Sequence, residues 1–66
     1  MDKFHTRMRM LREQFGLSQE YVGSKLGISQ QAYSNYEMDK GEISVKHAVE
    51  LAGMYNVSTD YLLGIS

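Results

Sequence analysis

Residues 30–37 carry the most distinctive chemistry in this chain of 66 residues. On a helix, which turns by about 100° per residue, one face of this segment has only uncharged hydrogen-bonding side chains: Gln30, Gln31, Ser34 and Asn35. The other face has Ala32, Tyr33 and Tyr36 and is expected to pack. A carboxamide donates and accepts at once, so it can pair with the N6 and N7 edge of adenine. Because a solvated helix face usually carries Lys and Glu, this polar face indicates recognition.

Two short helices joined by a tight turn are expected to position that face. Ser18 and Ser29 are good N-caps, which predicts helices over 19–26 and 30–37. This is the spacing of a helix-turn-helix. Gly23 falls on the inner side of the first of these helices, where a glycine costs about 1 kcal/mol against alanine. We therefore expect the next helix to approach Gly23 too closely for a larger side chain.

Three further helices complete the predicted fold. One is expected over 3–15, from the apolar spacing of Phe4, Met8, Leu11 and Phe15. Another lies between the cap Ser44 and the stop Asn56, with an apolar stripe of Val45, Ala48, Val49, Ala52 and Tyr55. The last follows Ser58 and spans 59–63. No strand pattern, repeat or linker is present, so the sequence predicts one all-α domain of five helices over residues 1–66.

The charge of the chain excludes some kinds of partner. Seven Lys and Arg against eight Asp and Glu give a formal net charge of -1, which excludes a polybasic coat for nucleic acid or anionic lipid. Anion binding must therefore be local. Four of the cations lie in the first twelve residues and make one side of the first helix basic: Lys3, Arg7, Arg9 and Arg12.

Length and residue types argue against an enzyme. A folded chain of this size buries only about 60% of its unfolded surface, which excludes most enzyme-sized pockets. Without cysteine there is no disulfide or zinc thiolate. His5 and His47 have no serine or acid at a telling spacing, belong to no metal motif and are expected at the surface. We expect no catalytic residue, metal or cofactor, and, without an apolar span or secretory signal, no membrane and a cytoplasmic location.

The chain resembles the lambda repressor and Cro-like family of bacterial and phage helix-turn-helix regulators over about residues 4–64. The resemblance rests on LREQFGLSQEYVGSKLGISQQAYSNYE, continued by ISVKHAVELAGMYNVSTDYLLG. It implies a five-helix lambda repressor-like DNA-binding domain in which the helix over 30–37 enters the major groove of double-stranded DNA. It also implies a homodimer. The SQQ at 29–31 is similar to the start of a lambdoid phage recognition helix, in which such glutamines read bases.

The resemblance assigns roles to individual residues. Base edges would be faced by Gln30, Gln31, Ser34 and Asn35, the last two equally readable as spacers in a water-mediated contact. Gln19 would bond a phosphate and buttress Gln30. Lys40 and Lys46 would contact the DNA backbone, although Lys46 also reads as a solvated charge at a helix start. Arg12 and Glu37 match a family pair in which an arginine ties down the end of the recognition helix.

The sequence departs from the family pattern after the recognition helix. Met38-Asp39 stands where the family commonly has Asn-Gly, and Ile43 replaces a frequent proline, so the loop that carries Lys40 is expected to differ in shape. Beyond this loop, the apolar C-terminal segment is the candidate dimer surface, through Tyr61, Leu63 and Ile65, whereas Leu62 is expected to close the core.

The expected function is a transcriptional regulator, in particular a repressor, that binds a two-fold symmetric operator. No small-molecule effector site is evident in the sequence. The alternative is a helix-turn-helix module that binds protein, such as an antitoxin-like neutraliser or an accessory subunit. Met10, Phe15 and Tyr21, which are often charged in relatives, read either as partner contacts for such a module or as ordinary exposed apolar surface.

Overall fold

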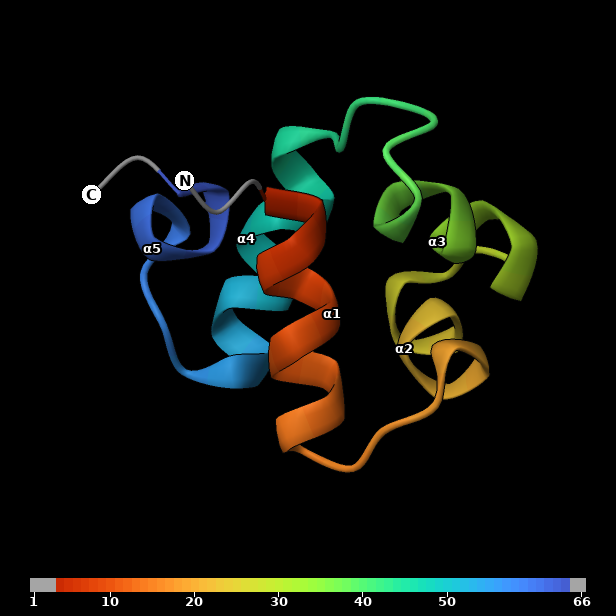
Figure 1. Cartoon of the computed structure of the whole chain (residues 1–66), viewed down its shortest axis with the longest axis horizontal. Coiled ribbons are helices and arrows are strands. Elements are labelled where there is room, and N and C mark those ends of the chain that lie inside the picture. Colours follow the sequence, from red (N-terminus) through yellow and green to blue (C-terminus); the bar gives the residue numbers. More distant parts are fainter. Residues whose placement is uncertain (1–3, 65–66) are drawn as a thin grey trace.

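The computed structural model describes residues 4–64, which form five helices and no strand. The helices are α1 (Phe4–Gln14), α2 (Gln19–Leu26), α3 (Gln30–Glu37), α4 (Val45–Tyr55) and α5 (Thr59–Leu63). In Figure 1, α1 stands at the centre, with α2 and α3 on one side and α5 on the other. Over these residues the predicted all-α fold is confirmed. None of the five helices is long and apolar enough to cross a membrane.

Four serines set where α2, α3, α4 and α5 begin. Each has an extended backbone, and its hydroxyl accepts a hydrogen bond from the amide three residues later. These caps are Ser18, Ser29, Ser44 and Ser58, and each satisfies one of the free N–H groups of a first turn. The predicted bounds of these helices are therefore confirmed. Asn56, at φ +57°, ends α4 in the left-handed conformation, as expected.

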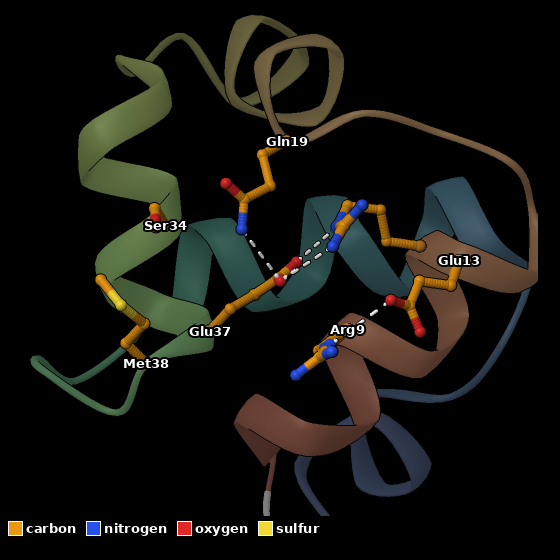
Figure 2. Close-up of a pocket in the computed structure, with 7 residues that line it drawn as sticks. Arg9, Glu13, Gln19, Ser34, Glu37 and Met38 are labelled. Carbon is orange, nitrogen blue, oxygen red and sulfur yellow. Dashed lines mark hydrogen bonds and ion pairs between the residues drawn. The ribbon is translucent and has the colours of Figure 1, made fainter.

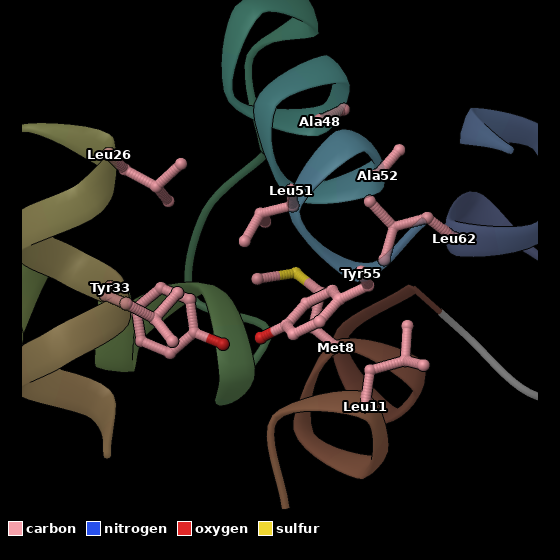
Figure 3. Close-up of a cluster of buried hydrophobic side chains, with 10 residues drawn as sticks. Met8, Leu11, Leu26, Tyr33, Ala48, Leu51, Ala52, Tyr55 and Leu62 are labelled. Atoms are coloured by element: carbon pink, nitrogen blue, oxygen red, sulfur yellow. The ribbon is translucent and has the colours of Figure 1, made fainter. Parts of the chain in front are cut away.

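The core lies where α1, α2, α3, α4 and α5 meet, as Figure 3 shows for its buried side chains. Tyr33 of α3 is fully buried, as the sequence predicts. In Figure 3 its hydroxyl points toward that of Tyr55 from α4, and neither hydroxyl has a hydrogen-bond partner among residues 4–64. Burial raises the pKa of Tyr33 above its ordinary value and that of Tyr55 to about 12. Both rings therefore stay neutral, and Tyr33 holds the inner side of α3.

The apolar stripe predicted for α4 is wrong at two positions. Val45 is 81% exposed and Val49 is 54% exposed. The other three residues of the predicted stripe, Ala48, Ala52 and Tyr55, are buried, and Leu51 is buried with them. Leu51 has more apolar area to remove from water than either valine, so α4 turns Leu51 inward and its two valines outward.

Phe15 also differs from its predicted place. The helix α1 ends at Gln14, so Phe15 lies in the following turn, although its amide still donates to the carbonyl of Leu11, at 3.0 Å. Its side chain is half exposed, and its ring packs edge-on against Tyr55, with the ring centroids 5.1 Å apart. Phe15 therefore shields the rim of the core instead of filling its centre.

The close approach at Gly23 is confirmed, but by the turn instead of the next helix. A Cβ atom on Gly23 would lie 3.1 Å from the backbone oxygen of Ser29 and 3.3 Å from that of Ile28. The amide of Ile28 also donates to the carbonyl of Gly23, at 2.9 Å. The glycine therefore allows α2 and α3 to be joined by a very short connection.

This contact predicts opposite effects for two Gly→Ala substitutions. Alanine favours a helix by about 1 kcal/mol, but at Gly23 its methyl group would press on fixed carbonyl oxygens. We expect Gly23→Ala to lower the free energy of unfolding by about 1 kcal/mol net. Gly53→Ala in α4, where a Cβ meets nothing within 4 Å, should raise it by about 0.5–1 kcal/mol. Urea unfolding of both variants measures the difference, and stabilisation by Gly23→Ala would contradict the close approach.

Candidate nucleic-acid interface

The polar face of α3 lies on the outside of the molecule. Gln30 and Gln31 are exposed, and Ser34 and Asn35 are half-buried. Because Tyr33 is fully buried, the helix can turn only this uncharged face outward. The structure thus places the four predicted base-contacting residues on one accessible side of a helix that is fixed from behind.

Two of these side chains are bonded to each other. The Nε2 atom of Gln31 donates to Oδ1 of Asn35 at 3.1 Å, one helical turn further along. Gln30 has no comparable side-chain bond among residues 4–64. The sequence gives the i, i+4 spacing of this pair, which is a known arrangement for carboxamides on a helix, but our sequence interpretation did not use it.

An ion pair joins α1 to the last residue of α3. The Nε atom of Arg12 lies 2.7 Å from Oε2 of Glu37, and its NH2 group lies 3.1 Å from Oε1 (Figure 2). This is the two-pronged geometry that Arg and a carboxylate favour. Arg12 also donates to the backbone oxygen of Leu17, at 2.9 Å. The two residues expected to pair are therefore in contact, and Arg12 ties the loop after α1 to the same point.

The carboxylate of Glu37 is buried but kept ionised. Its side chain is 3% exposed and that of Arg12 is 14% exposed. Burial alone would raise the pKa of Glu37, but the hydrogen bonds from Arg12 and Gln19 outweigh it and lower that pKa below its ordinary value. The hydrogen bond to Glu37 likewise raises the pKa of Arg12. Both charges therefore persist at neutral pH, at the end of α3.

Gln19 has a different partner from the one we expected. Its Nε2 atom donates to Oε1 of Glu37, at 3.2 Å, and no hydrogen bond to Gln30 exists among the described residues (Figure 2). The expectation that Gln19 buttresses Gln30 is therefore wrong for this structure. A buried carboxylate is a stronger acceptor than an exposed amide, and it needs donors for all its lone pairs. Gln19 instead connects the start of α2 to the end of α3.

An open pocket of about 260 Å³ lies beside this ion pair, between α1, α2 and α3 (Figure 2). It is lined by Arg9, Arg12, Glu13, Gln19, Ser34, Glu37 and Met38. Arg9 pairs with Glu13 at 3.4 Å on its α1 side. Two arginines thus face two glutamates, so the charge of the lining is balanced. In the part of the chain that the structure describes, no group of three His, Cys, Asp or Glu could hold a metal ion.

A second polar link holds α3 to α4. The hydroxyl of Tyr36 and Nδ1 of His47 lie 2.9 Å apart, and the two rings meet edge-on, with centroids 5.9 Å apart. Our expectation of a surface histidine is therefore wrong for His47, which is half-buried. The sequence carries no local sign of this bond because it depends on how the first turn of α4 approaches α3. The bond therefore ties the first turn of α4, which carries Lys46, to α3.

The loop after α3 contains the departure from the family pattern. Asp39 has φ +59°, a left-handed conformation that suits glycine or asparagine better. The amide of Lys40 then donates to the carbonyl of Asn35, at 2.9 Å, which closes the end of α3. His5, also expected at the surface, is half-buried, and its Nδ1 lies 3.9 Å from Oδ1 of Asp39. Lys40 and Lys46 are both exposed.

The left-handed backbone of Asp39 predicts a stabilising substitution. Asp39→Gly should raise the free energy of unfolding by about 0.5 kcal/mol, because glycine adopts this conformation without strain. The weak contact with His5 would be lost. Asp60→Gly, the same substitution inside α5, should instead destabilise by about 1 kcal/mol. Thermal unfolding compares the two, and equal losses in both variants would contradict strain at Asp39.

The predicted dimer residues fall into three different situations. Tyr61 is 42% exposed, and the guanidinium of Arg7 lies 4.3 Å from its ring centroid and donates to its backbone oxygen. Leu63 is half-buried against the core, so it offers less open surface than we expected. Ile65 lies outside the described residues. Leu62 is fully buried, as predicted.

The chain is similar to known helix-turn-helix proteins both in sequence and in fold. A family model described as helix-turn-helix matches residues 8–62. The HTH-type transcriptional regulator ImmR of Bacillus subtilis (strain 168) is 40% identical over 58 residues, which are 88% of this chain and 46% of that protein. The uncharacterized HTH-type transcriptional regulator YobD of the same strain is 37% identical over 60 residues, which are 91% of this chain and 54% of that protein. The chain thus spans about half the length of these relatives.

Two solved structures have a similar fold. The P22 c2 repressor in complex with a synthetic operator, 9T, is 26% identical, with a TM-score of 0.89 and full coverage of both chains. The solution structure of the DNA-binding domain of the P22 c2 repressor is 27% identical, with a TM-score of 0.85. That match covers 94% of this chain and 82% of the other. In both matches the similarity extends beyond the helix-turn-helix to all or nearly all of the chain.

Proposed function

Because this chain belongs to the helix-turn-helix family of lambda repressor-like regulators, we propose that it is a sequence-specific DNA-binding transcription regulator that places α3 in the major groove. One observation carries the proposal. Uncharged amides and hydroxyls cover the outer face of α3, while Tyr33 and Glu37 fix its inner face to the rest of the fold. Such a face can hydrogen-bond to base edges even though the chain has no large positive net charge. The matched relatives bear the names of regulators, not enzymes.

The bases are proposed to be read by the outer face of α3. Gln30 and Gln31 are the most exposed of its four polar residues and supply the direct contacts, and Ser34 and Asn35 lie further along the same face. A carboxamide is suited to adenine, whose major-groove edge has one donor and one acceptor. The repressor with the same fold is described in complex with an operator, which supports this use of the helix.

Phosphate contacts are proposed for residues that flank α3. Lys40 lies in the loop after it and Lys46 in the first turn of α4, and both are exposed. Gln19 opens α2, where the amides of the first turn favour an anion, and one of the two N–H groups of its carboxamide is not used by Glu37 and can donate to a phosphate. These contacts would fix the register of α3 on the duplex, whereas Arg12 and Glu37 would orient the helix without contacting DNA.

We further propose that the protein acts as a repressor and binds a two-fold symmetric operator as a homodimer. With a net charge of -1, one subunit can make few phosphate contacts, and nonspecific binding by such domains is only about 10⁻⁴ to 10⁻⁶ M. Two copies of α3 spaced by about 34 Å would read successive turns of the major groove and combine their affinities. Tyr61 and Leu63, together with Ile65, remain the candidates for the contact between subunits.

A helix-turn-helix module that binds protein is the alternative function. Three exposed apolar side chains favour it: Met10 is 44% exposed, Phe15 is 50% exposed and Tyr21 is 45% exposed. Such side chains are common on soluble domains when they are scattered. Tyr21 also lies under the ammonium of Lys25, at 5.3 Å from the ring centroid, so part of its surface is already used.

Selection of duplexes from a random pool tests the proposed function. We expect a two-fold symmetric motif with half-sites about 10 base pairs apart. Affinity for the selected duplex should fall steeply as salt rises, because phosphate contacts release counterions. A protein-binding module would enrich no duplex and would show no salt-dependent DNA affinity, and that result would overturn the proposal.

A further inference from the structure

Two carboxamides on the outer face of α3 are already joined before any ligand is bound. Nε2 of Gln31 donates to Oδ1 of Asn35 at 3.1 Å. A Gln amide has two N–H donors and one acceptor oxygen, so Gln31 keeps one N–H and its oxygen for another partner. Asn35 has given one lone pair of its oxygen to this bond and keeps both of its N–H donors. Gln30, the residue before Gln31, has no such partner in the described chain.

We propose that Asn35 is a positioning residue for Gln31, so that the two amides read neighbouring base pairs as one unit and not as independent contacts. This inference rests on the proposed function. An exposed Gln side chain samples many rotamers, and ordering it on binding lowers affinity. A bond to a half-buried residue one turn away removes part of that freedom in advance. Gln31 is therefore prepared for its contact, whereas Gln30 is ordered only when DNA binds.

The groups left free by this bond define the bases that fit. The oxygen and remaining N–H of Gln31 match the N6 donor and N7 acceptor of adenine. Asn35 offers its two N–H donors, because its oxygen has already given one lone pair to Gln31, and guanine has two acceptors, N7 and O6, on its major-groove edge. Residues four apart on a helix are separated by about 6 Å along its axis, and successive base pairs by about 3.4 Å. This separation corresponds to roughly two base-pair steps, so the pair specifies an adenine with a guanine one or two base pairs away.

The test compares base preference in variants of Asn35. Asn35→Ala removes the acceptor for Gln31, whereas Asn35→Asp keeps an acceptor and removes the donors. Gln14→Ala is the control for DNA binding, because Gln14 is exposed at the end of α1 and is not placed on DNA. Ser34→Ala is the control for the NMR measurement below, because Ser34 lies on the same face without a bond to Gln31. The base pair read by Gln31 is first identified as the one whose preference is lost in Gln31→Ala. The measured quantity is the ratio of two affinities, one for the selected duplex and one for a duplex substituted at that base pair. A change in protein charge that affects both duplexes equally cancels in this ratio.

At the base pair read by Gln31, we expect Asn35→Ala to lower the preference by about fivefold, the value of one hydrogen bond. Gln14→Ala should leave this preference unchanged, and Asn35→Asp should retain it because the acceptor for Gln31 is kept. The double variant Gln31→Ala/Asn35→Ala should lose no more preference there than Gln31→Ala alone. Melting temperatures of the variants should stay close to that of the parent, which separates positioning from a loss of fold.

Two results would overturn the inference while leaving the proposed function intact. One is a preference at the Gln31 base pair that is unaffected by Asn35→Ala, with losses confined to another base pair. The other would come from NMR of the free protein. We expect Asn35→Ala, but not Ser34→Ala, to shift the resonances of the side-chain amide protons of Gln31. Unchanged shifts would show that the bond does not exist in solution. If the parent protein enriches no duplex at all, the proposed function fails and the inference fails with it.

Discussion

Glu37→Ala should lower the free energy of unfolding by about 3 kcal/mol or more, because it leaves the charge of Arg12 buried without its partner. Arg12 is 14% exposed and also donates to Leu17, so it cannot move into water without breaking a second bond. A domain of this size has a total stability of roughly 3–10 kcal/mol. A large share of the folded population should therefore be lost, as measured by urea unfolding, and DNA binding should weaken with it.

Two controls test whether the loss of stability comes from leaving a buried charge without its partner. Glu13→Ala removes the glutamate of the exposed pair with Arg9, and such pairs contribute less than about 1 kcal/mol. Arg12→Met/Glu37→Leu replaces both buried partners with apolar side chains, which often restores stability. If the pair orients α3, this double variant should fold well and still discriminate poorly between duplexes. Unchanged stability in Glu37→Ala would contradict the partnership with Arg12.

The lowered pKa of Glu37 gives the same pair a pH dependence. Since the folded-state pKa lies below the ordinary value of 4.5, the stabilisation by Glu37 is complete above that value and is lost as pH falls through the folded-state pKa. Melting temperatures of the parent should therefore drop faster below pH 4.5 than those of the Arg12→Met/Glu37→Leu variant. Parallel curves for the two proteins would indicate that other carboxylates control acid unfolding.

Gln30→Ala should lower affinity for the selected operator by about 1–3 kcal/mol and relax base choice at one position in each half-site. Gln30 is exposed and unbonded, so its truncation leaves no unsatisfied group in the protein, and stability should not change. The loss would thus report on the contact with the base. Titrations with the selected duplex, a singly substituted duplex and random duplex give the three affinities that are needed.

The matched control for Gln30 is Gln14→Ala, an exposed glutamine at the end of α1 that the proposal does not place on DNA. It should bind all three duplexes like the parent. Equal losses on the operator and on random DNA in Gln30→Ala would refute base readout by this residue. Retained specificity with weaker binding overall would assign it to the phosphates instead.

Local signals in the sequence were enough for most of the fold. The four capping serines fix the starts of their helices through bonds within three residues, so the predicted bounds of α2, α3, α4 and α5 agree with the structure. The outward polar face of α3 was also predictable, because apolar and amide residues separate cleanly at helical spacing. The proximity of Arg12 and Glu37, 25 positions apart, came only from the family resemblance.

The remaining errors concern how helices pack on one another. The rotation of α4 that exposes Val45 and Val49 depends on which side chains fill the core best, and periodicity alone does not decide this. The links from Gln19 to Glu37 and from Tyr36 to His47 join different helices, so no local pattern contains them. Gln31 and Asn35 are the exception, because their bond lies within one helix and follows from spacing.

The short length of α3 bears on the genetics of such a regulator. Eight residues are too few for a helix to persist in water by itself, so its outer face exists only while its inner face is packed. Substitutions at Tyr33 or Glu37 should therefore produce temperature-sensitive alleles, active in cool cells and inactive in warm ones. Substitutions at Gln30 should be equally defective at every growth temperature. A screen of random mutants at two temperatures would sort the substitutions in α3 into these two phenotypic classes.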